Sequence, residues 1–247
     1  MGLLEIVARR SMSLVGIAAL FVLALFFNWA DLDRRFSALF FDSGAHRFLL
    51  KNDPLWNGWI YGAQRGLAIL MWASLLGAWL YLKFSKQDRS AACGFLAFTL
   101  VVSGIAALTV GQLKGVSAHS CPWSLAQYSG TANFFYLGQA APANAGPGHC
   151  FPSGHSAAAF MWIAGIYASR RWFGKGMLPI GAGVVLFGIS VGLLQIARGA
   201  HFVSHVLTAA ALSWGIAYLA DLFVEFNNLQ PPRVAHALQE GILRTEP

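Results

Sequence analysis

Charged residues are scarce in this chain of 247 residues: they make up 11% of it, against about 25% in a typical soluble domain. Cysteine is also rare, with three residues, which excludes a small disulfide-rich secreted module. Hydrophobic residues, in contrast, account for 57%, and the mean hydropathy is +0.56. This balance excludes an ordinary soluble enzyme and a disordered protein, and it indicates an integral membrane protein.

Six apolar runs are long enough, or nearly so, to cross about 30 Å of hydrocarbon as helices. They are residues 11–29, 66–84, 91–113, 153–168, 177–197 and 204–224. The first has the basic start of a signal peptide, but its long core and the Asn28-Trp29-Ala30 exit favour a retained anchor. The fourth is the shortest and could instead be buried or only partly spanning. The predicted fold class is all-α, a polytopic membrane protein with six transmembrane helices in one bundle, and residues 1–247 form a single domain.

The net charge of +7, from 17 Lys and Arg against 10 Asp and Glu, would suggest a nucleic-acid partner in a soluble protein. In a membrane protein basic residues flank the spans, so no nucleic acid is expected. If the N-terminus is cytoplasmic, ten of the 17 basic residues lie on the cytoplasmic side. Five more lie in the first outer loop, residues 30–65. The later outer loops hold only Lys114 and Arg198. This distribution predicts that both termini are cytoplasmic.

Histidine gathers in or beside the two later outer loops, near those two cations. The residues are His119, His149, His155, His201 and His205. They could simply be solvated at the interface, with the cations snorkelling, but so many ionisable groups on one face favour a functional site. His201 and His205 have the i, i+4 spacing of zinc ligands, yet neither loop contains a carboxylate, so no metal is expected.

The string Pro152-Ser153-Gly154-His155 stands directly before or at the start of the fourth run. Pro suits a helix start and Ser a helix N-cap, so the N–H groups of the first turn would form an anion site. Gly154 lets a phosphate approach the backbone, and His155 could give or take a proton near neutral pH. A capping turn alone would explain Ser-Gly, but the whole string at a span boundary favours phosphate chemistry.

Lys114 ends the third run and Arg198 follows the fifth. Both could clamp phosphate oxygens through charge-assisted hydrogen bonds. His201 lies three residues after Arg198, and an imidazole can carry a phosphoryl group as a covalent intermediate. The pattern therefore predicts a phosphoryl-transfer site at the outer ends of several helices.

These residues resemble the motifs of the type 2 phosphatidic-acid phosphatase family, which includes membrane lipid phosphate phosphatases and is related to the vanadium haloperoxidases. The family pattern is Lys-x6-Arg-Pro, Pro-Ser-Gly-His and Ser-Arg-x5-His-x3-Asp. The second motif is intact here, and the match runs from Lys114 to His205, within a motif core of about residues 111–210. The resemblance implies that His201 attacks phosphorus, that His155 is the general acid and then the general base, and that no metal or cofactor takes part. It also implies that the phosphoryl oxygens are held by Lys114, Arg198, Ser153 and the amides of Ser153 and Gly154.

The sequence departs from the family pattern at three positions. Cys121 and Gln195 stand where the family has arginines, and His205 stands where it has an aspartate. Arg198 lies one helical turn after Gln195 and could reach the same phosphate if the helix continues. A neutral His205 brings no negative charge to orient His201. Further supporting groups are therefore considered: His119, Gln195 and His205 themselves, and a replacement carboxylate from Asp31, Asp33, Asp42 or Asp53.

Cys121 and Cys150 share one outer loop, and pairing is chemically allowed outside the cytoplasm. We predict a Cys121–Cys150 disulfide, which would close a loop of about 30 residues and add about 3.5 kcal/mol in the chain-entropy model. Cys93 is expected to be an inert packing residue. Residues 30–65 suit an interfacial segment that could admit a lipid headgroup, although their composition favours a simple surface-lying linker. Residues 130–148 are predicted to be a loop over the site.

The sequence thus predicts a metal-independent phosphatase that hydrolyses a phosphomonoester or pyrophosphate of a membrane lipid through a phosphohistidine. The segments around Cys121 and His201 look like a bacterial branch of the family, so the expected location is the bacterial inner membrane, with the active site facing the periplasm. Two alternatives stay open: a lipid phosphotransferase with the same intermediate, and a non-catalytic lipid-binding protein, which the three departures would favour.

Overall fold

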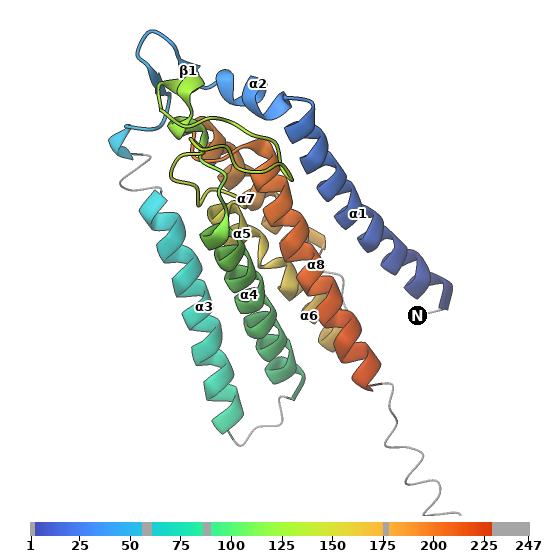
Figure 1. Ribbon diagram of the computed structural model, residues 1–247. Helices are drawn as coiled ribbons and strands as arrows, with labels where there is room; N and C mark the ends of the chain where they lie inside the picture. Colours follow the sequence, from blue (N-terminus) through green and yellow to red (C-terminus); the bar gives the residue numbers. More distant parts are fainter. Residues whose placement is uncertain (1–2, 56–60, 86–89, 175–177, 229–247) are drawn as a thin grey trace, which may run out of the picture.

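The computed structural model describes residues 3–55, 61–85, 90–174 and 178–228, and it is mostly helical (Figure 1). The helices are α1 (Leu3–Trp29), α2 (Leu32–Ala38), α3 (Tyr61–Phe84), α4 (Ser90–Val116), α5 (Gly154–Phe160), α6 (Ile163–Phe173), α7 (Leu178–Ala197) and α8 (Val203–Asn228). A short hairpin, β1 (Phe41–Asp42) and β2 (Arg47–Phe48), and two 3-10 turns, η2 (Pro122–Ser124) and η3 (Ala126–Tyr128), lie in the connections. Long apolar runs become helices because a backbone in hydrocarbon must satisfy its own N–H and C=O groups.

Four helices are long and apolar enough to cross a membrane. The qualifying stretches are Arg10–Trp29 of α1, Gly62–Phe84 of α3, Ala91–Val116 of α4 and Val203–Asn227 of α8. They correspond to four of the six predicted spans. The apolar stretch of α7, Gly181–Ala197, is shorter. The expected number of six spanning helices is therefore not confirmed for the part of the chain that the structure describes.

The expected fourth span, residues 153–168, is wrong as a single helix. A turn at Met161 and Trp162 divides it into α5 and α6. At this turn the N–H of Ala164 donates to the Met161 carbonyl (3.2 Å) and that of Gly165 to the Trp162 carbonyl (3.0 Å), so the chain tightens to i, i+3 bonds. Many of the side chains of α5 and α6 are buried. The short length of this run also allowed a buried segment, and the structure shows that alternative.

Helices α4 and α8 form the centre of the bundle. α4 packs against α3, α6 and α8, and α8 packs against α1, α4 and α5, so that α1 and α3 lie on opposite sides (Figure 1). Glycines on α7 allow close packing: a Cβ on Gly188 would lie 2.1 Å from Phe160 Cε1, and one on Gly192 would lie 2.6 Å from Val206 Cγ1. Small residues of this kind let α7 pack directly on α5 and α8.

The two ends of the bundle differ in chemistry. Where α1 begins and α8 ends, Arg10 pairs with Glu225 (2.6 Å) and Arg171 with Asp221 (2.7 Å). The opposite end carries the β1–β2 hairpin, the loops after α4 and the connection from α7 to α8 (Figure 1). The start of α1 and the end of α8 thus share one end of the bundle, as the predicted topology requires.

The first outer loop is more than the surface-lying linker that its composition favours. Phe48 of β2 is only 1% exposed, and its ring packs against Tyr128, with 5.0 Å between the ring centroids. Phe202, directly before α8, belongs to the same buried cluster. The loop therefore packs onto the end of the bundle that holds the histidines. Trp56 and Trp59, which also supported an interfacial segment, lie outside the described residues.

Candidate active site

Ser153 caps the N-terminus of α5, as the sequence predicts. Its Oγ accepts a hydrogen bond from the N–H of Ser156 (3.3 Å). Lys114, near the end of α4, reaches the same place, because a Cβ on Gly154 would lie 3.8 Å from Lys114 Cδ. The bare backbone of Gly154 thus lies beside a cation. Since α5 has only seven residues, its dipole is weaker than that of the expected long span, and Lys114 supplies the main positive charge here.

The amide of Ser153 has a structural partner. Its N–H donates to the carbonyl of His205 (3.1 Å), and Ser153 is fully buried. This bond ties the start of α5 to the first turns of α8. The expectation that the Ser153 amide holds a phosphoryl oxygen therefore differs from the structure, in which that N–H is already engaged.

The end of α7 is closed by a Schellman motif. Gly199 has φ +70°, the N–H of Ala200 donates to the Gln195 carbonyl (2.9 Å), and the N–H of Gly199 donates to the Ile196 carbonyl (2.8 Å). The left-handed residue turns the chain sharply, so that His201 follows within two residues of the turn. Glycine is suited to this position because it tolerates positive φ without steric cost.

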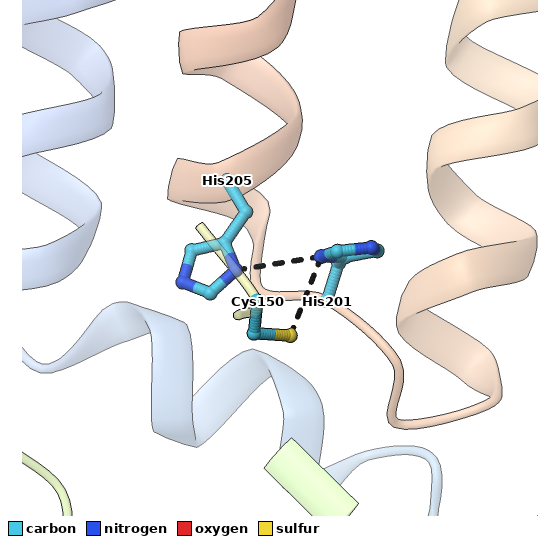
Figure 2. Close-up of side chains that lie close together, drawn as sticks. All are labelled: Cys150, His201 and His205. Carbon is cyan, nitrogen blue, oxygen red and sulfur yellow. Dashed lines mark hydrogen bonds between the residues drawn. The ribbon is translucent and has the colours of Figure 1, made fainter. Parts of the chain in front are cut away.

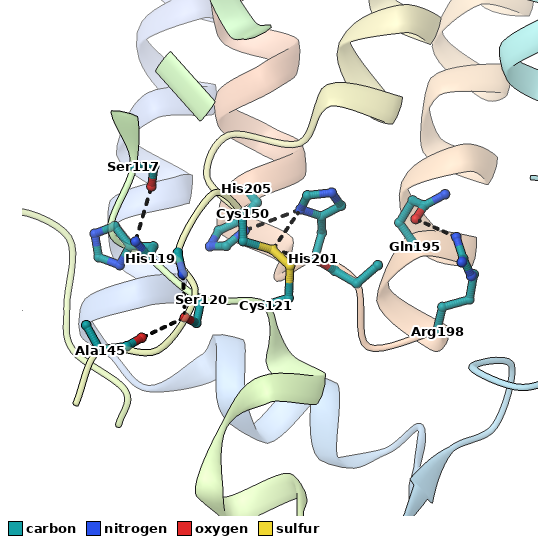
Figure 3. Close-up of a disulfide and its surroundings, with 12 residues drawn as sticks. Ser117, His119, Ser120, Cys121, Ala145, Cys150, Gln195, Arg198, His201 and His205 are labelled. Carbon is teal, nitrogen blue, oxygen red and sulfur yellow. Dashed lines mark hydrogen bonds between the residues drawn. A yellow bond between two sulfur atoms is a disulfide. The ribbon is translucent and has the colours of Figure 1, made fainter. Parts of the chain in front are cut away.

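The same turn fixes Arg198. Its Nη1 donates to Oε1 of Gln195 (3.1 Å), and the two side chains lie together on α7 (Figure 3). The helical geometry therefore does bring Arg198 to the face of residue 195, as the i, i+3 spacing predicts. Gly199 is also covered from outside, since a Cβ there would lie 2.3 Å from Cδ2 of Phe48. The first outer loop thus packs directly on the turn before His201.

His201, His205 and Cys150 meet in the interior of the site (Figure 2). Nδ1 of His201 lies 3.5 Å from Nδ1 of His205 and 3.6 Å from Sγ of Cys150. His201 and His205 are each 2% exposed, and Cys150 is fully buried. Because both neighbours face Nδ1, the other ring nitrogen of His201, Nε2, is the one that points away from them. A histidine held at Nδ1 offers the lone pair of Nε2 for attack.

The predicted disulfide is present and joins Cys121 to Cys150 (Figure 3). It connects the chain just before η2 with the chain just before the Pro152–His155 motif. Cys150, His201 and His205 lie close enough to hold a metal ion by distance alone. A disulfide sulfur is not a thiolate, however, and thiolate is the form in which cysteine ligates metals. The disulfide state of Cys150 thus argues against a metal centre built on this cluster.

Of the four aspartates considered as replacements for the family carboxylate, Asp33 reaches the first turn of α8. It is fully buried and accepts hydrogen bonds from the N–H of Ser204 (2.9 Å) and from its hydroxyl. Burial raises the pKa of this carboxyl above its usual value. The other three serve local partners: Asp31 pairs with Arg34, Asp42 accepts from the N–H groups of Gly44 and Ala45, and Asp53 accepts from that of Leu55. Asp33 therefore anchors Ser204 and does not replace a carboxylate at His201.

Positive charges surround His155. Burial and the nearby charges of Lys114, Arg198 and Arg65 lower the pKa of His155 to about 4. Burial, followed by the influence of His205, Lys114 and His155, lowers the pKa of His201 well below its usual value. The free site therefore holds neutral imidazoles beside basic side chains at neutral pH, an arrangement suited to an anionic ligand.

His119 and His149 have different surroundings. His119 stacks on Phe135, with 4.1 Å between ring centroids, and burial lowers its pKa. Phe151 separates it from His205, with its ring edge-on to both. His119 and His205 also line one small pocket, and the supporting role of His119 stays a prediction. His149 is exposed, and its N–H donates to the Ser117 carbonyl (2.7 Å).

An apolar groove of about 600 Å³ opens beside the site between α1, α4, α8 and the loop 135–141. Its wall includes Leu113, adjacent to Lys114, and Pro152, adjacent to Ser153. Further lining comes from Phe21, Leu25, Leu137 and Leu212. The irregular loop 130–148 thus covers this region, as the sequence predicts, and the groove beneath it is lined mainly by apolar side chains.

Two residues near the start of α3 lie close to His155, and the sequence pattern did not predict them as site residues. Nε2 of Gln64 donates to the carbonyl of His155 (3.2 Å), and the adjacent Arg65 is one of the charges that act on His155. The only sequence signal was the excess of basic residues in the first outer loop, to which Arg65 belongs. Pattern reasoning could not select it, because its contact with α5 depends on how α3 packs.

Comparisons with known proteins identify a family and a similar fold. Residues 90–229, more than half of the chain, match the PAP2 superfamily. The fold is similar to the crystal structure of a transmembrane PAP2-type phosphatidylglycerolphosphate phosphatase from Bacillus subtilis, with a TM-score of 0.51 and 18% identity. That similarity covers 85% of this chain and 96% of the other. No curated protein matches the sequence. The matched residues include Lys114, the Pro152–His155 motif, Arg198 and His201.

Proposed function

This chain belongs to the PAP2 superfamily, and from that premise we propose that it is a metal-independent phosphatase that hydrolyses the phosphomonoester or pyrophosphate of a membrane lipid. The observation that carries the proposal is the convergence of two histidines with pKa values lowered by burial and nearby charges, His201 and His155, with the cations Lys114 and Arg198. A phosphoryl group placed among the cations would face a neutral imidazole, which is the protonation state that a nucleophile needs.

The proposed reaction has two steps. Nε2 of His201 attacks phosphorus, an N–P bond forms, and the bond to the lipid oxygen breaks as His155 donates a proton to that oxygen. Neutral His155 then accepts a proton from water, the water oxygen bonds to phosphorus, and the N–P bond breaks. The products are the dephosphorylated lipid and inorganic phosphate. Lys114 and Arg198 stabilise the charge on the equatorial oxygens throughout.

The acid role of His155 requires a proton that the free enzyme does not hold at neutral pH. Its pKa is lowered to about 4 mainly by burial and then by three cations. An incoming phosphate carries negative charge into the middle of those cations and offsets their repulsion of the imidazolium. Substrate binding therefore raises the pKa of His155 and supplies the protonated acid only when a phosphate is present.

A lipid substrate is supported by the groove and by the helices. Four helices have the length and composition of membrane spans, so the site lies at the end of a membrane bundle. The apolar wall of the groove, which has a volume of about 600 Å³, includes Leu113 and Pro152. These residues directly precede Lys114 and Ser153 of the proposed phosphate site. A hydrocarbon chain in the groove would place its terminal phosphate near Lys114 and Gly154. The proposed partners are thus a lipid phosphate and the bilayer itself.

The disulfide supports the proposed location. Disulfides form and persist outside the cytoplasm, and this one lies at the same end of the bundle as His201. The distribution of Lys and Arg puts that end on the outer side as well. We therefore place the site on the periplasmic face of a bacterial inner membrane, with both termini in the cytoplasm.

Phosphate release from a panel of lipid phosphates, measured with detergent-purified protein in EDTA, tests the function. The panel includes a phosphatidate, phosphatidylglycerol phosphate, an isoprenyl pyrophosphate and lipid A, with His201→Ala beside the unmodified protein. Release that persists in EDTA and disappears in His201→Ala is expected. Release that depends on a divalent metal, or that survives in His201→Ala, would contradict the mechanism.

If no lipid in the panel releases phosphate, two further measurements distinguish the alternative functions. If lipid alcohols added as acceptors restore turnover, the chain is a phosphotransferase that keeps the same covalent intermediate. If orthovanadate, which mimics pentacoordinate phosphorus, does not bind either, the chain is a non-catalytic lipid-binding protein. Vanadate binding that is lost in Lys114→Ala would support the proposed phosphate site even if no tested lipid is turned over.

A further inference from the structure

Two of the departures from the motif pattern meet at one place in the fold. Cys121 stands at the position of a motif arginine, and His205 stands at the position of the motif aspartate. Cys121 is bonded to Cys150, and Cys150 lies against the ring of His201, beside His205 (Figures 2 and 3). Cys121, at the first altered position, thus holds Cys150 close to His205, at the second.

The contacts place Cys150 at the side of His201 that a carboxylate would take. Sγ of Cys150 is 3.6 Å from Nδ1 of His201, and Nδ1 of His205 is 3.5 Å from the same nitrogen. The carbonyl of Cys150 also faces the imidazoles of both His201 and His205 as a hydrogen-bond acceptor. A ring nitrogen faced by an acceptor carries the proton, which leaves the opposite nitrogen as the free lone pair.

Cys150 is held firmly enough for such a role. It is fully buried, its N–H donates to the carbonyl of His119 (3.0 Å), and its sulfur lies 2.8 Å from the carbonyl oxygen of Ala200. The disulfide adds a covalent link to Cys121, directly before η2. One main-chain hydrogen bond and one covalent bond therefore hold Cys150 in place.

We propose that the Cys121–Cys150 disulfide does the work of the missing carboxylate: it holds Cys150 against Nδ1 of His201, so that Nδ1 keeps its proton and Nε2 faces the phosphate. Cys150 and Cys121 are thus positioning residues, and His201 remains the catalytic one. This inference rests on the proposed function. It explains how a site without the motif aspartate orients its nucleophile, and why that loss accompanies a cysteine at position 121.

The first test is a rescue experiment. Cys121→Ser/Cys150→Ser should lower kcat by about 10- to 100-fold, the usual cost of removing a group that orients a functional histidine, with a much smaller change in KM. Adding His205→Asp to that double variant supplies a carboxylate beside His201 and should restore most of the lost kcat. The same His205→Asp change with the disulfide intact supplies the reference kcat for this second background. Cys93→Ser is the matched control and should leave kcat unchanged.

A disulfide that only staples the loop predicts a different pattern. The loss of kcat would then be the same with and without His205→Asp, and this result would overturn the proposal. A loss confined to KM would overturn it as well, because orientation of the nucleophile affects the chemical step.

The second test needs no folded double variant. Nitrogen-15 NMR of histidine-labelled protein in detergent, with His201→Asn to assign the signal, reports which ring nitrogen of His201 carries the proton. We expect the proton on Nδ1, and a change of that signal when the disulfide is reduced by a phosphine in the folded protein. A proton on Nε2, or a signal that reduction leaves unaltered, would refute the positioning role. Because this readout does not use turnover, it separates failure of this inference from failure of the proposed activity.

Discussion

The carboxylate of Asp33, on α2, binds both the N–H and the hydroxyl of Ser204, three residues after His201. Asn28 donates to the same carboxyl group (3.2 Å), so α1, α2 and α8 meet at one buried acidic side chain. Asp33→Ala should destabilise the fold by about 1–3 kcal/mol, because the Ser204 donors would stay buried without a partner. It should also lower kcat through movement of His201.

Thermal unfolding in detergent, together with kcat, checks this prediction for Asp33. Asp33→Asn should be milder than Asp33→Ala because an amide oxygen can keep one of the hydrogen bonds. Asp42→Asn is the control, since Asp42 serves an exposed turn. Equal stability of Asp33→Ala and Asp42→Asn would show that the buried Asp33 side chain is not needed at the start of α8.

Arg198 and Gln195 should contribute unequally to phosphate binding. Arg198→Ala removes a charged donor, and we expect kcat/KM to fall by roughly 10- to 100-fold, since a hydrogen bond to a charged group is worth about 1.5–3 kcal/mol. Gln195→Ala removes only the neutral group that holds the guanidinium, so a fall of less than about tenfold is expected. Steady-state kinetics of both variants, with exposed Arg35→Ala as the control, measures the difference. A larger effect at Gln195 would mean that Arg198 is not the clamp.

Phosphate binding should be accompanied by proton uptake at His155. In the free protein the pKa of His155 is lowered to about 4, so near pH 6 it is neutral. A bound phosphate raises that pKa, so the complex binds more protons than the free protein in the interval between the two values. Calorimetry of phosphate binding in buffers with different ionisation enthalpies gives the number of protons taken up.

His155→Asn removes this titrating group while phosphate keeps its own ionisation. The uptake should therefore be smaller in His155→Asn than in the unmodified protein at the same pH. Identical values for the two proteins would remove His155 from the role of proton donor.

Filling the apolar groove should discriminate between substrates by chain length. Leu113→Trp places a larger side chain in the groove beside Lys114, and we expect KM for a long-chain lipid phosphate to rise by about tenfold, which corresponds to about 1.4 kcal/mol. A short-chain, water-soluble phosphate should keep its KM. Leu108→Trp, on an exposed part of the same helix, is the control. Equal effects on both substrates would place the hydrocarbon chain elsewhere.

The local chemistry of the site was more accessible from sequence than its tertiary contacts. Ser153 as a helix cap, the Cys121–Cys150 disulfide and the approach of Arg198 to Gln195 follow from short spacings and known backbone geometry. The break after Phe160 did not, because an apolar run gives no sign of the turn that divides α5 from α6.

Contacts between distant segments also escaped prediction. The engagement of the Ser153 amide by His205, and the choice of Asp33 among four aspartates, depend on which surfaces meet when α2, α5 and α8 pack. Composition made the first outer loop look like a linker because one buried ring, Phe48, carries no signal that distinguishes it from neighbouring aromatics. Periodicity reports which face is apolar, and it does not report which partner covers that face.

The contact between Phe48 and Gly199 restricts how this protein can diverge. Any side chain at 199 would meet the Phe48 ring and would also have to adopt positive φ, so a mutation there first requires a smaller residue at 48. A smaller residue at 48 on its own would leave a void above the turn that precedes His201. The packing therefore couples these two positions, so that a substitution at one is expected to need a compensating change at the other. Phe48, which lies 151 residues before Gly199 in the chain, thus limits which residues the turn before His201 accepts.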